Sequence, residues 1–292
     1  MNKPFRLSMR KRHILEGYSF ISLWIVGFLL FLAVPLGRSL YYSFQTLEPS
    51  ESGLKATYVG MLNYRAAFTT DINFLPLLQK TMVTMLTQVP LILIFAIMSA
   101  LLLNRHSIGR GMFRGIFFLP VIIASGAILR ELLEQGAAQL PIFLNDDLFN
   151  KLSFLIPEEI LEPLLGYADS LTLVMWDAGV QILIFLAGLQ TISPILYEAA
   201  KMDGATKWES FWKITFPMIM PMIFVNTLFS IVNSFTKADN QIMNHLMTVV
   251  FRDNNYGYGS AIGWLYFFFI FIVLGAVFLM FRKSMATSEG RA

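Results

Sequence analysis

The chain has 292 residues, of which 56% are hydrophobic and only 14% are charged, and its net charge at pH 7 is +3. This composition is too apolar for an ordinary soluble domain and indicates a chain that crosses a membrane several times. The chain has no cysteine, which excludes disulfides, thiolate nucleophiles and cysteine-bound metals. Its basic residues form no stripe interleaved with aromatic residues, so no nucleic-acid partner is expected.

Six apolar segments are long enough to be predicted as transmembrane helices. In chain order they cover about residues 17–40, 81–104, 113–134, 170–192, 214–236 and 259–281. The first is too long for the apolar core of a signal peptide and lacks a small-residue cleavage site, so we expect it to be retained. With no internal repeat or soluble domain, residues 1–292 are predicted to form a single all-α, polytopic membrane domain.

The distribution of charge predicts the topology of these helices. The two chain ends, the turn after the second helix and the polar segment after the fourth contain 14 of the 22 basic residues but 5 of the 19 acidic ones. Lysine and arginine concentrate on the cytoplasmic side of membrane proteins, so we expect these regions, including both termini, to be cytoplasmic. Residues 41–79, 237–255 and an acidic segment between the third and fourth helices are then outside, the last with short interfacial helices.

The polar segment between the fourth and fifth helices, 197–221, reads YEAAKMDGATKWESFWKITFPMIMP. Pro194 directly follows a serine and predicts a helix start, whereas Gly204 provides the positive φ at which that helix can end. Thr206 and Glu209 have the spacing of a capping box, which predicts a second short helix. Two short helices joined by a bend would suit docking to a partner.

This segment resembles the EAA loop of ABC-importer permeases. The matching residues are Glu198, Ala199, Ala200, Asp203, Gly204, Ala205, Ile214 and Pro217. Phe216 departs from the pattern, in which leucine is usual, and we expect altered packing rather than lost function because phenylalanine is also apolar. Residues 81–281 also resemble the carbohydrate-uptake branch of that family, which includes maltose-type and lipooligosaccharide-type sugar permeases.

The resemblance implies a permease subunit of an ATP-driven importer, located in a bacterial or archaeal inner membrane and surrounded by membrane lipid. It implies a sugar or oligosaccharide cargo, an external solute-binding protein, a second and non-identical permease, and two ATPase subunits that use ATP and magnesium. The matching residues would couple this chain to the ATPases. The alternatives are an importer of the same class for a non-sugar solute, such as an amino acid or phosphate, and a secondary transporter or channel.

The sequence contains no recognisable catalytic motif. It lacks the phosphate-binding loop G-x-x-x-x-G-K-[ST], so an ATPase must be a separate subunit. It also lacks H-E-x-x-H and G-x-S-x-G, so we expect neither an enzyme nor a cofactor in this chain. His13, His106 and His245 adjoin different apolar segments and are interpreted as solvated residues at the membrane interface rather than as metal ligands.

Polar residues within the predicted helices mark a candidate substrate path. Its residues are Trp176, Asp177, Gln181, Asn226, Ser230 and Asn233, with Thr81, Thr84 and Gln88 contributed by the second helix. For the amide and hydroxyl groups, cargo binding and bonding between helices both stay open. Asp177 and Trp176 favour sugar binding, because a carboxylate accepts hydroxyl protons and an aromatic face stacks on a sugar ring. The alternative for Asp177 is a salt bridge, for example with Arg130.

Overall fold

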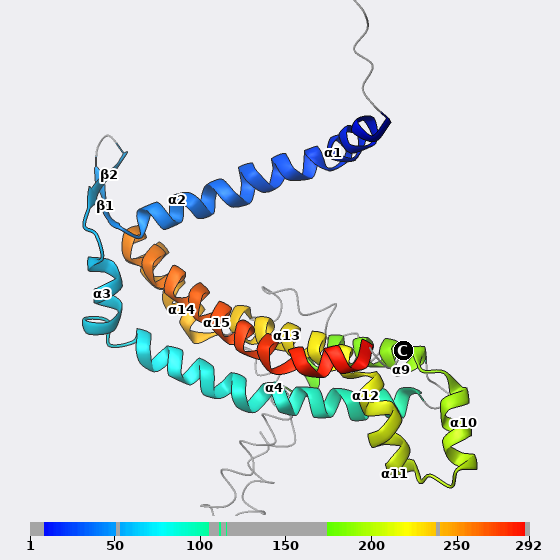
Figure 1. The fold of residues 1–292 in the computed structure, drawn as a ribbon. Helices are drawn as coiled ribbons and strands as arrows, with labels where there is room; N and C mark the ends of the chain where they lie inside the picture. The colour runs from blue at the N-terminus through cyan, green and yellow to red at the C-terminus, as the bar shows by residue number, and fades with distance from the viewer. Residues whose placement is uncertain are drawn as a thin grey trace, which may run out of the picture. The chain divides into compact units, whose positions relative to one another are not determined.

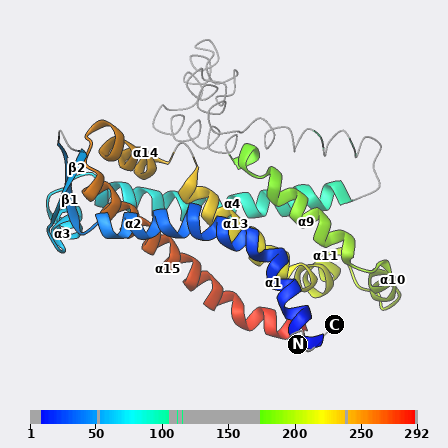
Figure 2. The ribbon, with the colours of Figure 1, turned by 90° about the horizontal axis from the view of Figure 1, so that it is seen from above.

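The computed structural model describes residues 9–50, 53–104, 111, 115, 174–237 and 240–289 (Figures 1 and 2). The chain divides into two compact units. One, called here the hairpin unit, comprises Met1–Leu75 and His245–Phe267. The other, called the bundle unit, comprises Pro76–Asn244 and Phe268–Ala292. Two long helices, α4 (Phe74–Asn104) and α15 (Tyr256–Glu289), run from one unit into the other.

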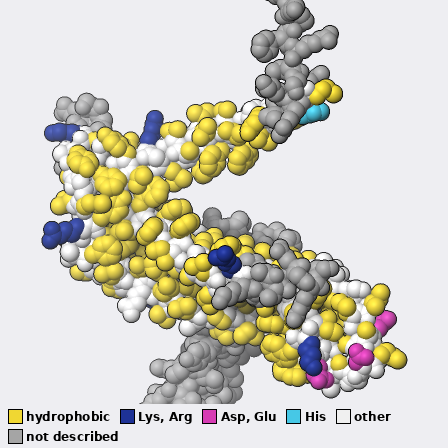
Figure 3. Space-filling view, viewed as in Figure 1, with side chains coloured by type: hydrophobic (Ala, Val, Ile, Leu, Met, Phe, Trp, Pro, Cys, Tyr) yellow, Lys and Arg dark blue, Asp and Glu magenta, His cyan; other side chains and the backbone are white. Residues whose placement is uncertain are grey.

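The hairpin unit begins with a continuous helical run built from α1 (Met9–Phe28), the π-helical η1 (Leu29–Ala33) and α2 (Val34–Tyr42). Its section Glu16–Tyr42 is long and apolar enough to cross a membrane, and none of it is buried within the chain. Figure 3 shows hydrophobic side chains along this run. A helix that is apolar and exposed on all sides requires lipid or another protein around it.

A two-stranded antiparallel sheet follows, formed by β1 (Gln45–Ser50) and β2 (Gly53–Tyr58). The register pairs Gln45 with Tyr58 and Ser50 with Gly53. The prediction of an all-α chain is therefore corrected to a mostly helical chain with one β-hairpin among the described residues. The segment contains proline and glycine, which are turn signals, but the sequence analysis predicts only that it lies outside the membrane.

Side chains from α3 (Leu62–Thr69) hold the hairpin in place. The buried Asn63 amide donates hydrogen bonds to the backbone oxygens of Ser43 and Gln45, both at 2.9 Å. The Ser43 hydroxyl lies 2.7 Å from the Tyr64 hydroxyl. These bonds satisfy polar backbone groups where the chain leaves α2 and starts β1, which helps a short hairpin to persist.

The core of the bundle unit joins α4, α9 (Gly179–Thr191) and the start of α13 (Met220–Thr236). Small residues of α4, including Ala96 and Ala100, belong to one buried cluster with Ile182 and Phe185 of α9. Gly188 lies against the side chain of Met222, so α9 and α13 approach closely at this point. Small residues at such contacts are typical of helices that pack within a membrane.

The described residues include three single helices suited to crossing a membrane, at Glu16–Tyr42, Phe74–Asn104 and Tyr256–Arg282. Two bent pairs, Gly179–Thr191 with Pro194–Met202 and Lys207–Met218 with Met220–Thr236, raise the total to at most five. The predicted third helix, 113–134, lies outside the described residues apart from Gly115, so six spans stay a prediction. Several bounds differ from those predicted, and α4 starts at Phe74 rather than at residue 81.

The earlier start of α4 has a local cause. The Asp71 carboxylate accepts hydrogen bonds from the backbone amides of Asn73 and Phe74, at 2.8 and 3.1 Å. These are amides that a helix start leaves without a partner inside the helix, so the aspartate supports a helix that begins before the apolar segment. The apolar length of a segment therefore does not by itself predict where the helix begins.

Candidate functional site

The segment between α9 and α13, residues 193–219, forms two short helical stretches and is called the elbow. It contains α10 (Pro194–Met202), α11 (Lys207–Ser210), the π-helical η2 (Phe211–Thr215) and α12 (Phe216–Met218). The chain bends by 64° between α9 and α10 and by 65° between α12 and α13. Ser193 occupies the N-cap of α10 and Pro194 the first turn, as predicted.

The end of α10 has the hydrogen bonds of a Schellman motif. The Ala205 amide donates to the Ala200 carbonyl at 2.9 Å, and the Gly204 amide donates to the Lys201 carbonyl at 3.1 Å. Gly204 has φ of 79°, a conformation in which glycine is not strained. The prediction that α10 ends at this glycine is confirmed.

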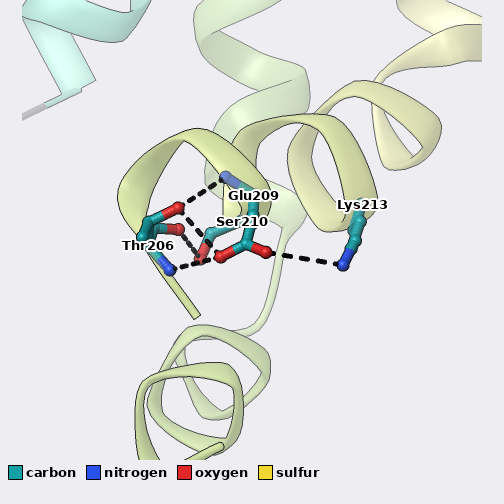
Figure 4. Close-up of polar contacts among 4 residues, drawn as sticks. All are labelled: Thr206, Glu209, Ser210 and Lys213. Atoms are coloured by element: carbon teal, nitrogen blue, oxygen red, sulfur yellow. Dashed lines mark hydrogen bonds and ion pairs between the residues drawn. The ribbon is translucent and has the colours of Figure 1, made fainter. Parts of the chain in front are cut away.

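The predicted capping box is present at the start of α11 (Figure 4). The Glu209 amide donates to the Thr206 hydroxyl at 3.2 Å, and the Thr206 amide donates to the Glu209 carboxylate at 2.9 Å. The carboxylate also lies 3.8 Å from the Lys213 ammonium, in an exposed pair that contributes little to stability. The box fixes the direction in which the chain leaves Gly204.

The two arms of the elbow are tied together by a hydrogen bond. The Tyr197 hydroxyl of α10 lies 2.9 Å from the Thr215 hydroxyl of η2, and Thr215 is buried. Pro217 and Pro221 lie on either side of the bend at Ile219, where missing amide hydrogens interrupt the helix. The hydrogen bond therefore links α10 to η2, and a bend at Ile219 separates η2 and α12 from α13.

The predicted coupling residues follow the surface of the elbow. Glu198, Ala199, Asp203 and Gly204 are exposed, and Ala200, Ala205, Ile214 and Pro217 are partly buried. Next to them, Met202 is 87% exposed and Trp208 is 70% exposed. Trp208, Phe211 and Trp212 also contact one another through their rings. Polar groups beside large exposed apolar side chains are typical of a protein-docking surface.

Within the bundle unit, the candidate path residues fall into two groups. In the first group, the Asp177 carboxylate lies 3.5 Å from the Lys237 ammonium, and the side chains are 21% and 18% exposed. The predicted alternative for Asp177, a salt bridge, is thus present, but with Lys237, while Arg130 lies outside the described residues. Trp176 is partly buried, and its indole N–H has no hydrogen-bond partner among the described residues. Asn233 is also partly buried.

The second group joins α9 to α13. The Gln181 side chain donates to the Ser230 hydroxyl at 2.8 Å, and the Asn226 side chain donates to the Gln181 backbone oxygen at 3.2 Å. Gln181 and Asn226 are 0% exposed. Their side-chain oxygens have no hydrogen-bond partner within the described part of the chain. In this conformation these groups bond the two helices to each other.

A polar pocket of the bundle unit brings together residues from three helices, α4, α13 and α14 (Gln241–Met247). It is lined by Lys80, Thr81, Thr84, Gln88, Ser234, Lys237, Asn240 and Gln241. The polar residues expected from the second helix are therefore located in one pocket. Lys237, Asn240 and Gln241 were missed because they lie in residues 237–255, which were expected outside the membrane, and Lys80 because it precedes the predicted second helix. Their proximity in the pocket depends on tertiary structure.

A second cluster missed by the sequence analysis lies in the hairpin unit, around Asp71. Its carboxylate accepts a hydrogen bond from the Tyr258 hydroxyl at 2.6 Å and lies 2.8 Å from His245 Nε2. Burial favours a higher pKa of the Asp71 carboxyl, but the bonds from Tyr258, His245 and two backbone amides outweigh it and lower this pKa below its ordinary value. The interpretation of His245 as a solvated residue was wrong, since its side chain is 16% exposed and paired.

Among the described residues, no group of three or more histidine, aspartate or glutamate side chains could hold a metal ion. The described site residues can form hydrogen bonds and ion pairs between apolar helices. Together with an exposed elbow, this arrangement of polar groups between apolar helices is typical of a polytopic membrane protein.

The chain belongs to the family of binding-protein-dependent transport system inner membrane components, whose model matches residues 73–284. It is 32% identical to a probable ABC transporter permease protein, YesP, of Bacillus subtilis, covering 95% of this chain and 92% of that protein. It is 27% identical to the arabinooligosaccharides transport system permease protein AraP of Halalkalibacterium halodurans, covering 88% and 84%. Its fold is similar to a chain of a bacterial alginate ABC transporter, with a TM-score of 0.65, 19% identity and coverage of 94% and 96%.

Proposed function

We propose that this chain is a permease subunit of an ATP-driven importer and translocates a sugar or oligosaccharide delivered by an external solute-binding protein. The family match supports a transport role, and relatives such as the arabinooligosaccharide permease support the cargo class. The observation that carries the proposal is the position of the elbow. It directly joins α9 and α13, and the polar residues Gln181, Asn226 and Ser230 also join these two helices.

The complete transporter in this proposal contains a second, non-identical permease and two ATPase subunits that use ATP and magnesium. This chain would contribute six spans in a single domain, with the elbow and both termini in the cytoplasm of a bacterial or archaeal cell. The charge asymmetry supports this orientation, since 14 of the 22 basic residues lie in the regions assigned to the cytoplasm. The exposed side chains of Met202 and Trp208 then face the ATPases.

The contacts of the elbow support the proposed coupling. Closure of the ATPases on ATP displaces α10, and the bond between Tyr197 and Thr215 carries that displacement to the start of α13. Because Gln181 bonds to Ser230 and Asn226 bonds to Gln181, α9 and α13 move together. Such discrete helix movements are a usual way of switching a cavity between its two openings.

The cargo path in this proposal runs beside the paired α9 and α13. Gln181, Asn226 and Ser230 fix the spacing of the two helices, and Trp176, Asp177 and Asn233 are more accessible for cargo. An indole ring stacks on the apolar face of a sugar, and carboxylate and amide groups bond to its hydroxyls. Asp177→Asn keeps the shape of the side chain and is expected to change the KM for cargo. Reduced thermal stability with an unchanged KM would leave Asp177 as a structural ion-pair partner.

The proposal is tested with the complete transporter in proteoliposomes, supplied with its solute-binding protein and labelled oligosaccharides. Uptake is expected to need ATP and magnesium, and to stop when the ATPase subunits are omitted. Uptake driven by an ion gradient without ATP would instead indicate a secondary transporter. ATP-dependent uptake of amino acids or phosphate, with no uptake of any sugar, would retain the importer and replace the cargo class.

A further inference from the structure

The polar pocket of the bundle unit contains buried hydroxyl groups without a bonding partner in the described part of the chain. Thr81 of α4 is 7% exposed and Ser234 of α13 is 8% exposed, and both side chains line the pocket. Neither hydroxyl bonds to another group among the described residues. A buried hydroxyl normally has a partner, because its hydrogen bonds to water are lost on burial. Two such hydroxyls in one pocket indicate a ligand that brings the missing hydrogen bonds.

One face of α4 adds further polar groups to the pocket. Thr81, Thr84 and Gln88 are separated by three and four residues, so they share one face of the helix. Thr84 and Gln88 also have no side-chain hydrogen bond to the described residues, and Gln241 adds a second amide from α14. Hydroxyl and amide groups both donate and accept hydrogen bonds. They suit a ligand that does the same, such as a sugar ring with several hydroxyls.

Asn240 fixes the corner between α13 and α14. Its buried side chain donates to the Ser234 backbone oxygen at 2.9 Å. Its side-chain oxygen accepts hydrogen bonds from the backbone amides of Ile242 and Met243, at 3.0 and 3.1 Å. These bonds hold Ser234 and Gln241 at defined positions on the two sides of the corner. Polar groups that are fixed before binding lose little entropy when a ligand arrives.

The proposed topology places the pocket at the outer ends of α4 and α13. Thr81 is near the start of α4, and Ser234 is near the end of α13. Both adjoin segments assigned to the outside from their charge, 41–79 and 237–255. The cavity volume is about 160 Å³, smaller than the roughly 300–1,000 Å³ of pockets that enclose a drug-sized ligand. The pocket therefore suits one sugar unit rather than a whole oligosaccharide.

We propose that this pocket is an outer binding site, which holds one sugar unit of the cargo through its hydroxyl groups. The inference rests on the proposed function, since it adds a binding site for the cargo of the same transporter. Thr81, Thr84 and Ser234 bond to the ring hydroxyls through their own hydroxyls, and Gln88 and Gln241 bond through their amides. The cargo occupies this site before it reaches the path beside α9 and α13.

Thr84→Val tests this contact, because valine keeps the shape of threonine and removes only the hydroxyl. Labelled arabinotriose and galactotriose serve as cargo for the complete transporter in proteoliposomes, together with its solute-binding protein. The KM for uptake should rise about fivefold, the effect of losing one hydrogen bond between uncharged groups. The melting temperature should not fall, since the Thr84 hydroxyl has no partner among the described residues to lose. A lower melting temperature with an unchanged KM would make Thr84 structural and overturn the inference.

Thr87→Val is the matched control on the same helix. Thr87 does not line the pocket, and its hydroxyl is bonded to the backbone oxygens of Val83 and Thr84 at 3.0 and 3.1 Å. This variant should leave the KM unchanged. An equal rise of the KM in both variants would overturn the inference, because the effect would then belong to α4 as a whole.

A thiol at position 84 reports occupancy of the pocket, and the chain has no native cysteine. Thr84→Cys is labelled with a small thiol reagent during ATP turnover, with cargo-loaded or with empty binding protein. The loaded protein should slow labelling, because the sugar covers the pocket. Tyr58→Cys, on exposed β2, is the control and should be labelled equally in both cases.

The outcomes separate this inference from the proposed function. Equal labelling at position 84 with and without cargo would leave a water-filled space only and overturn the inference. Labelling that changes with the lipid headgroup but not with cargo would also overturn it, because headgroup hydroxyls would then occupy the pocket. In both cases a sugar importer would remain. ATP-dependent uptake of a non-sugar solute, with no uptake of any sugar, would overturn the proposed function itself.

Discussion

Two glycines of the described chain have different physical reasons for lacking a side chain. Gly257, at the start of α15, lies so close to the Gln45 backbone oxygen that no Cβ fits between them. Gly188 of α9 faces the side chain of Met222, which is flexible and can move aside. The neighbour of Gly257 is backbone of β1, which belongs to the same hairpin unit and is rigid. Substitution by alanine should therefore have a larger effect at Gly257 than at Gly188.

Gly257→Ala is expected to destabilise the hairpin unit by about 1–3 kcal/mol, as overpacking of rigid contacts does. Gly188→Ala serves as the matched control and should cost less, since a methionine side chain can adopt another rotamer. Thermal unfolding of the purified transporter measures both. Equal melting temperatures for the two variants would show that the β1 backbone yields as easily as Met222.

The Asp71 carboxyl predicts a dependence of stability on pH. Because its folded pKa is lowered, the charged form contributes stability that is fully present above the unfolded pKa of about 3.9 and is lost as the pH falls through the folded pKa. The stability difference between the wild type and Asp71→Asn should therefore shrink as the pH falls below about 4. Exposed Asp253 provides the control, since Asp253→Asn changes a surface side chain and should change stability little.

At the scale of elements, the elbow could be predicted because its signals are local. A proline at a helix start, a glycine at positive φ and a threonine three residues before a glutamate all act within one or two helical turns. The Asp71 cluster could not be predicted in this way, since His245 and Tyr258 are 174 and 187 residues away from Asp71 in the chain. The polar pocket also depends on tertiary contacts between α4, α13 and α14.

The length of an apolar segment also could not predict where the membrane helices bend. Residues 214–236 met the length of a membrane span, yet the helix bends by 65° near Ile219 and α13 begins only at Met220. A run of apolar residues indicates that a segment is stable in lipid. The residues at which its helix begins, bends and ends depend instead on prolines and capping groups. The hairpin 45–58 was also missed. It is held by hydrogen bonds from Asn63 of α3, a contact that the sequence of the hairpin itself does not reveal.

Gly204→Val is expected to uncouple the elbow from the ATPases. Its φ of 79° strains a β-branched residue by roughly 1–2 kcal/mol, and this strain changes the angle between α10 and α11. Gly204→Asn is the matched control, because asparagine tolerates this conformation. No atom lies within 4 Å of an added Cβ at Gly204, so a clash would not explain a loss. Retention of both ATPase subunits and of cargo-stimulated ATP hydrolysis in the valine variant would contradict the coupling role.

At the scale of the whole molecule, the chain combines apolar helices suited to crossing a membrane with an elbow that exposes large apolar side chains. Glu16–Tyr42 is apolar and not buried within the chain, while the elbow exposes Met202 and Trp208 beside charged residues. The two kinds of surface belong in different environments, which limits how the chain can be inserted in the membrane. The distribution of basic residues predicts which side the elbow occupies.

Labelling of single cysteines tests this topology, and the chain has no native cysteine to interfere. Met202→Cys places a thiol on the elbow and Tyr58→Cys places one on β2, at side chains that are 87% and 72% exposed. In intact cells, an impermeant reagent should label the cysteine at position 58 and not the one at 202. Permeabilised cells should show both, which controls for reactivity. Labelling at 202 without permeabilisation would place the elbow outside, where no ATPase could use it, and would remove the basis of the proposed coupling.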